Sequence, residues 1–237
     1  MKTPNKIRNF HIRFQKSRWK LYNQKIEKEF GKSESWGGFY LDPTDYNLLV
    51  SAFDNAKTIE IDLQNNPLYL TTALSFEALK KLNENNKYKD GIDLELAIKF
   101  FNNKYKNEIK KTVKSPYRIV NIRAWEMLPL KDKFGPSQFH TDGFLPSHLK
   151  VMIYLTELNA ETGTIQFEGL PPLEKTKGFV LVFQNSSIVH AAVPGTNRPR
   201  KLIELTIQRL DKNLDLNPAI GFCNDRHFKK PKFAYKI

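Results

Sequence analysis

The sequence has little cysteine and no long apolar run. Cys223 is the only cysteine among 237 residues, which excludes an internal disulfide framework and a cysteine-rich zinc site. No stretch approaches the roughly 18 consecutive apolar residues that a membrane-spanning helix needs. Residues 1–20 lack the apolar core of a secretory signal peptide. We therefore expect a soluble, cytoplasmic protein, and the 40% hydrophobic content suits one domain with its own core.

The net charge of +13 is not spread evenly along the chain, because acidic residues are scarce at its two ends. Residues 1–32 hold ten Lys and Arg against two Glu, and residues 226–236 hold five basic residues and no acid. Residues 136–209 hold seven basic and six acidic residues. Basic ends of this kind either keep a protein soluble or bind a phosphate-rich partner. Lysines that are simply solvated at the surface are the more common of the two. Because no zinc finger, helix-turn-helix or RNA-binding motif is present, we expect any nucleic-acid binding to be weak and non-specific.

The part of the chain before residue 115 has mainly helical patterns. Apolar residues recur at helical spacing in 42–56, 75–85 and 93–113, and each segment opens with Asp or Ser, which favour the first position of a helix. The segment 57–63 predicts a short strand that joins a later sheet. No internal repeat or low-complexity linker divides the chain.

From Tyr117 onward, apolar and polar residues alternate with a period of two, which predicts strands. The predicted strands are 117–127, 149–158, 163–169, 178–184, 187–193 and 200–210. Turn residues separate them, and no helical pattern intervenes. We therefore predict a mainly β protein with some α: a jelly-roll core over 116–210, a mostly helical extension over 1–115 and a basic segment over 211–237.

Two of these strands have one apolar and one mixed face. The apolar faces hold Leu149, Val151, Ile153 and Leu155, and Lys201, Ile203, Leu205 and Ile207. The mixed faces hold Lys150, Met152, Tyr154 and Thr156, and Arg200, Leu202, Glu204 and Thr206. A mixed face is more often a solvent face, but it also suits the interior of a barrel that holds a polar ligand.

The stretch "QFHTDGF" places His140 and Asp142 two residues apart, and a second histidine, His190, follows in the predicted strand 187–193. A lone histidine on an apolar strand is usually a core residue, but Arg200 opens the next strand and completes a chemical set. Two imidazoles and one carboxylate form the facial triad that holds Fe(II) in non-haem oxygenases. A zinc hydrolase would accept the same three ligands, but it would not explain an inward-facing arginine. We expect His148, in the turn "PSHLK", to lie on the surface.

Residues 118–209 resemble the double-stranded β-helix core of the Fe(II)/2-oxoglutarate-dependent oxygenases, and most of all the phytanoyl-CoA dioxygenase-like branch. The similarity lies in "FHTDGF", "KVMIYLTEL", "GFVLVFQNSSIVHAA" and "RPRKLIELTIQ". It implies that His140, Asp142 and His190 bind the metal, and that Arg200 binds 2-oxoglutarate with help from the Tyr154 hydroxyl.

Two further side chains near this set have open roles. Arg198 competes with Arg200 as the anchor of the cosubstrate, but it precedes Pro199 in a turn, and we expect it to be solvated. Glu204 shares the face of Arg200 and either pairs with Arg118 or Arg123 or faces the substrate.

The resemblance implies an Fe(II)/2-oxoglutarate-dependent dioxygenase that uses O2, oxidises a C–H bond of a small metabolite, and releases succinate and CO2. An anionic metabolite is one candidate substrate, and the retained Asp142 favours hydroxylation. Two alternatives are an oxygenase that grips a macromolecule through its basic ends, and a non-catalytic binding protein on the same fold. The residues leave the oligomeric state open.

Overall fold

The computed structural model describes residues 20–59, 86–90, 96, 99–130, 135–142, 147–211 and 221–222. Within these residues, most strands form one large, largely antiparallel sheet in the order β1-β7-β5-β9-β4-β3-β2, and β10 pairs with β4 in parallel. Its strands are β1 (Trp36–Tyr40), β2 (Lys57–Ile59), β3 (Asn86–Asp90), β4 (Tyr117–Met127), β5 (His148–Tyr154), β7 (Phe179–Phe183), β9 (Arg200–Arg209) and β10 (Gly221–Phe222). A smaller sheet pairs β6 (Gly163–Phe167) with β8 (His190–Pro194).

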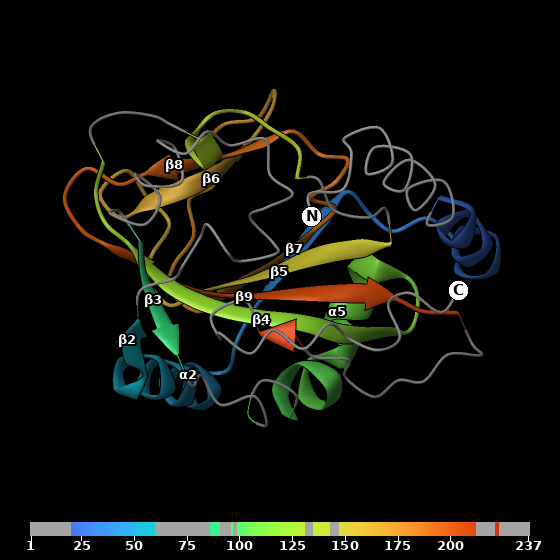
Figure 1. The fold of residues 1–237 in the computed structure, drawn as a ribbon, viewed down its shortest axis with the longest axis horizontal. Coiled ribbons are helices and arrows are strands. Elements are labelled where there is room, and N and C mark those ends of the chain that lie inside the picture. The colour runs from blue at the N-terminus through green and yellow to red at the C-terminus, as the bar shows by residue number, and fades with distance from the viewer. Residues whose placement is uncertain are drawn as a thin grey trace, which may run out of the picture.

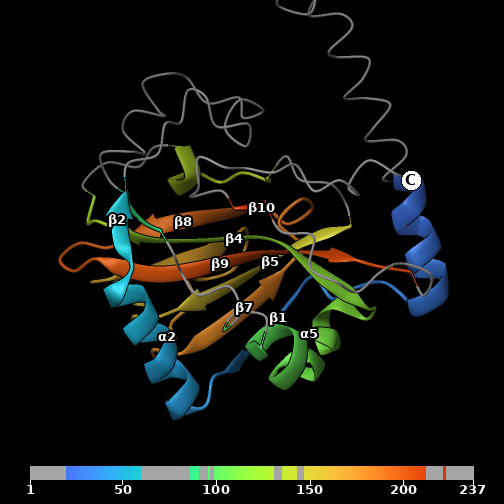
Figure 2. The same cartoon turned by 60° about the horizontal axis from the view of Figure 1, so that its bottom comes forward.

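The described elements lie in layers, with the large sheet in the middle (Figures 1 and 2). The small sheet faces one side of it. The other side is covered by α2 (Pro43–Asn55) and α5 (Lys106–Val113), and α5 follows one turn of π-helix, η1 (Lys99–Lys104). A helix over residues 20–30 lies beside the end of β9, where Lys25 pairs with Asp211 at 2.7 Å. No helix in the described part is long and apolar enough to cross a membrane.

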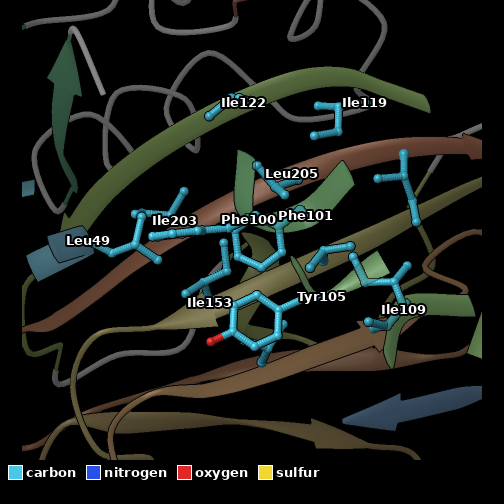
Figure 3. Close-up of a cluster of buried hydrophobic side chains, with 14 of the residues drawn as sticks. Leu49, Phe100, Phe101, Tyr105, Ile109, Ile119, Ile122, Ile153, Ile203 and Leu205 are labelled. Carbon is cyan, nitrogen blue, oxygen red and sulfur yellow. The ribbon is translucent and has the colours of Figure 1, made fainter. Parts of the chain in front are cut away.

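The main hydrophobic core fills the space between the helices and the large sheet (Figure 3). Alternate residues of β5 and β9 point into it, and their neighbours point to the opposite face of the sheet. The apolar faces predicted for these two strands are therefore the core faces, as the burial of Val151, Ile153, Ile203 and Leu205 shows.

The opposite face of the large sheet is turned toward the small sheet. A second cluster of apolar side chains lies there, and it includes Tyr154, Leu202, Phe183 and Phe167. The mixed faces of β5 and β9 thus form the interior of a two-layered β structure rather than a solvent face. This arrangement buries polar side chains such as Glu204 beside apolar ones.

The predicted elements agree with the structure where the period is strong. Strand 117–127 has the bounds of β4, and helix 42–56 becomes α2. Helix 93–113 is described at residue 96, which is helical, and from 99 onward, as η1 and α5. Strand 57–63 is described only over β2, and helix 75–85 lies outside the described residues.

Three described strands were not predicted, and the bounds of two others differ from the prediction. Strand β10 lies in the segment 211–237, for which no strand was expected, and β5 ends at Tyr154 rather than at residue 158. Neither β1 nor β3 was predicted, because "WGGFY" and "NKYKD" hold glycines or charges that disfavour strands, and pairing with β7 and β4 overrides this preference. Strand β8 begins at His190 rather than at residue 187. Ser187 and Ile188 donate their main-chain N–H groups to the carbonyl of Gln184 and form a turn there.

Candidate metal centre

His140, Asp142 and His190 come together at one end of the small sheet. The main-chain N–H of His140 donates to the carbonyl of His190 at 3.0 Å, and the N–H of His190 donates back to His140 at 2.9 Å. The N–H of Asp142 donates to the carbonyl of Asn185 at 2.8 Å. These main-chain bonds fix the three Cα positions, and one ligand atom from each side chain lies within 4.8 Å of the others.

Both imidazoles are oriented with Nε2 toward the centre of the cluster. His140 Nδ1 lies 2.8 Å from the carbonyl of Gln138, and His190 Nδ1 lies 2.9 Å from the carbonyl of Ile188. A carbonyl oxygen only accepts, so Nδ1 carries a proton in each ring, and Nε2 is the nitrogen that offers a lone pair to a metal when the ring is neutral.

The Asp142 carboxylate faces both imidazoles. Its Oδ1 lies 3.4 Å from His140 Nε2, and its Oδ2 lies 3.8 Å from His190 Nε2. Burial alone raises the pKa of this carboxyl, but the nearby Lys150 ammonium, the His140 imidazole and the hydrogen bonds from Lys150 and Asn185 hold the pKa well below its usual range. Asp142 is therefore charged at neutral pH, as a metal ligand must be.

The two histidines differ in their surroundings. Burial lowers the pKa of His190 to about 4, and the Phe183 ring packs edge-on against the imidazole with 5.0 Å between ring centroids. The hydrogen bond to Asp142 raises the pKa of His140. His190 is thus neutral at pH 7 and is held in place by an apolar wall.

Arg200 opens β9 and is buried, with 3% of its surface exposed. Its guanidinium donates to the carbonyls of Thr164 and Val193 in the small sheet and contacts Met127 Sδ at 3.1 Å. Its Nε has no hydrogen-bond partner, and no carboxylate pairs with it in the described part of the chain. Burial lowers the pKa of Arg200, although an arginine keeps its charge at neutral pH.

Tyr154 lies on the same inner face and is buried, which raises its pKa to about 12. It pairs with Leu202 across the β5–β9 ladder, one inward-facing position from Arg200. Arg198 lies outside this face, with 55% of its side chain exposed, and pairs with Glu161 at 2.7 Å. The structure therefore brings Arg200, and not Arg198, to the interior.

Glu204 forms a buried ion pair with Arg123, which resolves the alternatives that the sequence left open. The Arg123 guanidinium donates to both carboxylate oxygens, at 2.7 and 2.8 Å. Arg118 instead donates to Gln208 at 2.9 Å. Lys150 Nζ lies 3.3 Å from Glu204 Oε2.

The expectation that His148 lies on the surface was wrong. It is the first residue of β5, only 8% of it is exposed, and burial lowers its pKa to about 3. The strand starts one residue earlier than the alternation suggested, because His148 pairs with Gln208 on β9. It remains distinct from the His140–Asp142–His190 cluster.

Sequence reasoning missed two side chains that contact Asp142. Lys150 Nζ lies 2.5 Å from Asp142 Oδ2, and Asn185 Nδ2 donates to the same oxygen at 3.0 Å. Lys150 was placed on the mixed face of its strand, but a lysine in such a pattern usually reaches solvent. Asn185 lies in a turn, where no periodic signal marks a buried residue.

Comparison of the sequence with models of known protein families and with curated proteins gives no match. Solved structures are similar in fold. One is the epimerase SnoN in complex with Fe3+, alpha ketoglutarate and nogalamycin RO, at 12% identity over 79% of this chain and 84% of that chain, with a TM-score of 0.52. Another is an oxidoreductase of the 2OG-Fe(II) oxygenase family from Burkholderia pseudomallei, at 11% identity over 74% and 85%, with a TM-score of 0.51. These similarities confirm the predicted jelly-roll fold.

Proposed function

We propose that this protein is an Fe(II)/2-oxoglutarate-dependent dioxygenase that hydroxylates a small molecule. One observation carries the proposal. The interior that holds the His140–Asp142–His190 cluster also holds Arg200, a buried guanidinium whose Nε has no hydrogen-bond partner among the described residues. A metal site alone needs no such group, whereas a dianionic cosubstrate needs both a metal chelate at one end and a cation at the other.

The three proposed ligands fit a divalent iron. Two imidazoles and a charged carboxylate converge, and the main-chain carbonyls of Gln138 and Ile188 orient both rings with Nε2 toward the cluster. His140, Asp142 and His190 would hold the ion through three ligand atoms, and the cosubstrate and O2 would bind at the positions that these residues do not take. Bound iron and 2-oxoglutarate would supply the oxidation of the C–H bond, with release of succinate and CO2.

Arg200 is the proposed anchor for the distal carboxylate of 2-oxoglutarate. A buried cation is costly unless it is paired, and the carbonyls and thioether around Arg200 leave its charge uncompensated in the described part of the chain. A bidentate carboxylate would compensate it. The Tyr154 hydroxyl is the proposed second contact.

The protein's remaining contribution is to orient the reactants and exclude water. Tyr154, Leu202 and Phe183 form an apolar wall on the inner face of the large sheet. Electrostatic interactions beside such an apolar surface are stronger than in water. A substrate that is already bound in the correct orientation loses little further entropy when it reacts.

A zinc hydrolase uses a similar ligand set, and turnover distinguishes the two functions. Purified protein would be incubated with Fe(II), ascorbate, O2 and 2-oxoglutarate against a panel of small metabolites, and succinate would be measured. We expect at least one metabolite to raise succinate formation well above the substrate-free rate, and Asp142→Ala to abolish it. Zn(II)-dependent hydrolysis without succinate would contradict the proposal.

A further inference from the structure

We infer that Lys150 is a positioning residue that makes Asp142 a single-oxygen ligand and favours binding of the anionic cosubstrate. This inference rests on the proposed function. It assigns a role to a buried lysine that contacts a proposed ligand without being a ligand itself.

The contact between Lys150 and Asp142 is short and buried. Lys150 Nζ lies 2.5 Å from Asp142 Oδ2, and only 8% of the lysine is exposed. A buried ammonium is stable only beside acids, and the second acid, Glu204, lies 3.3 Å away with 1% exposure. Two carboxylates thus flank the amino group of Lys150, which is the arrangement that a charged ammonium requires in a buried site.

Glu204 is itself held in place by Arg123, and it therefore helps to hold the Lys150 ammonium in one position. Arg123 donates to both of its carboxylate oxygens, and the two residues are direct partners in the β4–β9 ladder. Lys150 therefore links an ion pair anchored on two strands to the carboxylate of Asp142.

The two oxygens of Asp142 have different surroundings. Oδ2 accepts hydrogen bonds from Lys150 and from Asn185 Nδ2, at 2.5 and 3.0 Å. Oδ1 faces His140 Nε2 at 3.4 Å. Two donors occupy the lone pairs of Oδ2, so Oδ1 is the oxygen left for a metal. Asp142 would then bind a metal through one oxygen only, and Oδ2 would not compete with the cosubstrate.

The charge of Lys150 has opposite effects on the binding of Fe(II) and of 2-oxoglutarate. An ammonium so close to Asp142 repels a divalent cation bound there and attracts the anionic 2-oxoglutarate. If Lys150 served only to build the site, its loss would weaken the binding of both. If it positions Asp142 as inferred, its loss weakens cosubstrate binding alone.

Lys150→Met tests this, because methionine keeps much of the length and removes the charge. Glu204 keeps Arg123 as its partner, and Asp142 keeps Asn185, so neither acid is left alone. Lys150→Arg restores the charge. Lys201→Met is the matched control, since Lys201 lies on the same sheet but pairs with Asp54 at the surface.

Two dissociation constants would be measured anaerobically on the full chain. Fe(II) binding would be followed by calorimetry, and 2-oxoglutarate binding by the absorbance of its Fe(II) chelate. We expect Lys150→Met to bind Fe(II) at least as tightly as wild type and to bind 2-oxoglutarate at least about tenfold more weakly, which corresponds to about 1.4 kcal/mol. Lys150→Arg should recover most of this loss, and Lys201→Met should match wild type.

Two results with Lys150→Met would overturn the inference while leaving the proposed function intact: unchanged 2-oxoglutarate affinity, or Fe(II) affinity about tenfold weaker than wild type. A wild-type protein that binds Fe(II) but no 2-oxoglutarate would overturn the proposed function, and the inference with it. If Lys150→Met does not fold, Lys150→Gln, which keeps a neutral donor, replaces it and the same two constants decide.

Discussion

The main chains of His140 and His190 hydrogen-bond to each other in both directions, at 3.0 and 2.9 Å, although the residues are far apart in the sequence. This pair joins the segment before the large sheet's β5 to the first residue of β8. The geometry of the proposed metal centre is therefore a property of the backbone, and side-chain substitutions there should change binding more than folding.

The first prediction concerns the metal. Fe(II) binding should weaken at least about 100-fold in each of three variants, His140→Ala, Asp142→Ala and His190→Ala. Each variant removes one of the three proposed metal ligands. Calorimetric titration with Fe(II) under anaerobic conditions measures this.

Asp54→Asn, which removes a surface carboxylate, is the control and should bind Fe(II) like wild type. An unaltered affinity in His190→Ala would remove it from the proposed ligand set.

The second prediction concerns the cosubstrate anchor. A charged, bidentate contact in a buried pocket contributes about 1.5–3 kcal/mol, so Arg200→Ala should weaken 2-oxoglutarate binding by roughly tenfold or more. Fe(II) affinity should stay close to wild type, because Arg200 is not a proposed ligand. Tyr154→Phe should have a smaller effect, since a neutral hydroxyl contributes less than a guanidinium.

Arg198→Ala is the matched control for this experiment, because Arg198 is exposed and pairs with Glu161. It should leave 2-oxoglutarate binding unchanged. A large loss in Arg198→Ala, with none in Arg200→Ala, would mean that the anchor is the other arginine.

The sequence predicted the β strands that carry the site because their faces alternate strongly. The alternation in β5 and β9 separates Val151 and Leu205, which are core residues, from Tyr154 and Arg200, which face the interior. The spacing of His140, Asp142, His190 and Arg200 then predicted a set of residues that the fold does bring into one interior.

Other features could not be predicted, because they depend on contacts between distant residues. The burial of His148 and Lys150 follows from the pairing of β5 with β9, whereas histidine and lysine beside a turn are usually exposed. The contact of Asn185 with Asp142 depends on how a turn approaches a segment far away in the sequence. No local sequence pattern indicates the burial of His148 and Lys150 or the contact between Asn185 and Asp142.

The third prediction concerns pH and stability. Burial lowers the pKa of His148 from 6.5 to about 3, so below pH 6.5 the unfolded chain binds a proton that the folded chain does not. The free energy of unfolding should therefore fall as the pH falls from 6.5 toward 3, by up to about 1.4 kcal/mol per pH unit for this proton.

Urea unfolding of the metal-free protein at pH 7 and pH 5 measures this loss. In His148→Gln, which cannot take up the proton, the loss should be smaller than in wild type. His190 also has a lowered pKa and is present in both proteins, so the difference between them isolates His148. An equal loss in both would mean that the burial of His148 has no such cost.

The fourth prediction concerns the turn that precedes Thr164, whose carbonyl accepts a hydrogen bond from Arg200. Gly163 has a φ of +85°, and an added Cβ would lie 2.6 Å from the main-chain nitrogen of Gly195. Gly163→Ala should therefore lower the free energy of unfolding by more than about 2 kcal/mol, from backbone strain and the clash together. Urea unfolding at pH 7 measures it.

Gly169→Ala provides the comparison, because Gly169 has a φ of +77° but nothing within 4 Å of an added Cβ. Its cost should be only the backbone term of about 1–2 kcal/mol. Equal losses in the two variants would mean that the close approach of Gly195 does not constrain this turn.

The proposed function depends most directly on whether one interior binds both iron and 2-oxoglutarate. Under anaerobic conditions, wild-type protein loaded with Fe(II) would be titrated with 2-oxoglutarate, and the visible absorbance of the Fe(II) chelate would be recorded. We predict a saturable absorbance band with one 2-oxoglutarate per chain, lost in His190→Ala and shifted to higher 2-oxoglutarate concentrations in Arg200→Ala. The absence of this band in wild type, or an equal band in His190→Ala, would contradict the assignment of this protein as an Fe(II)/2-oxoglutarate-dependent dioxygenase.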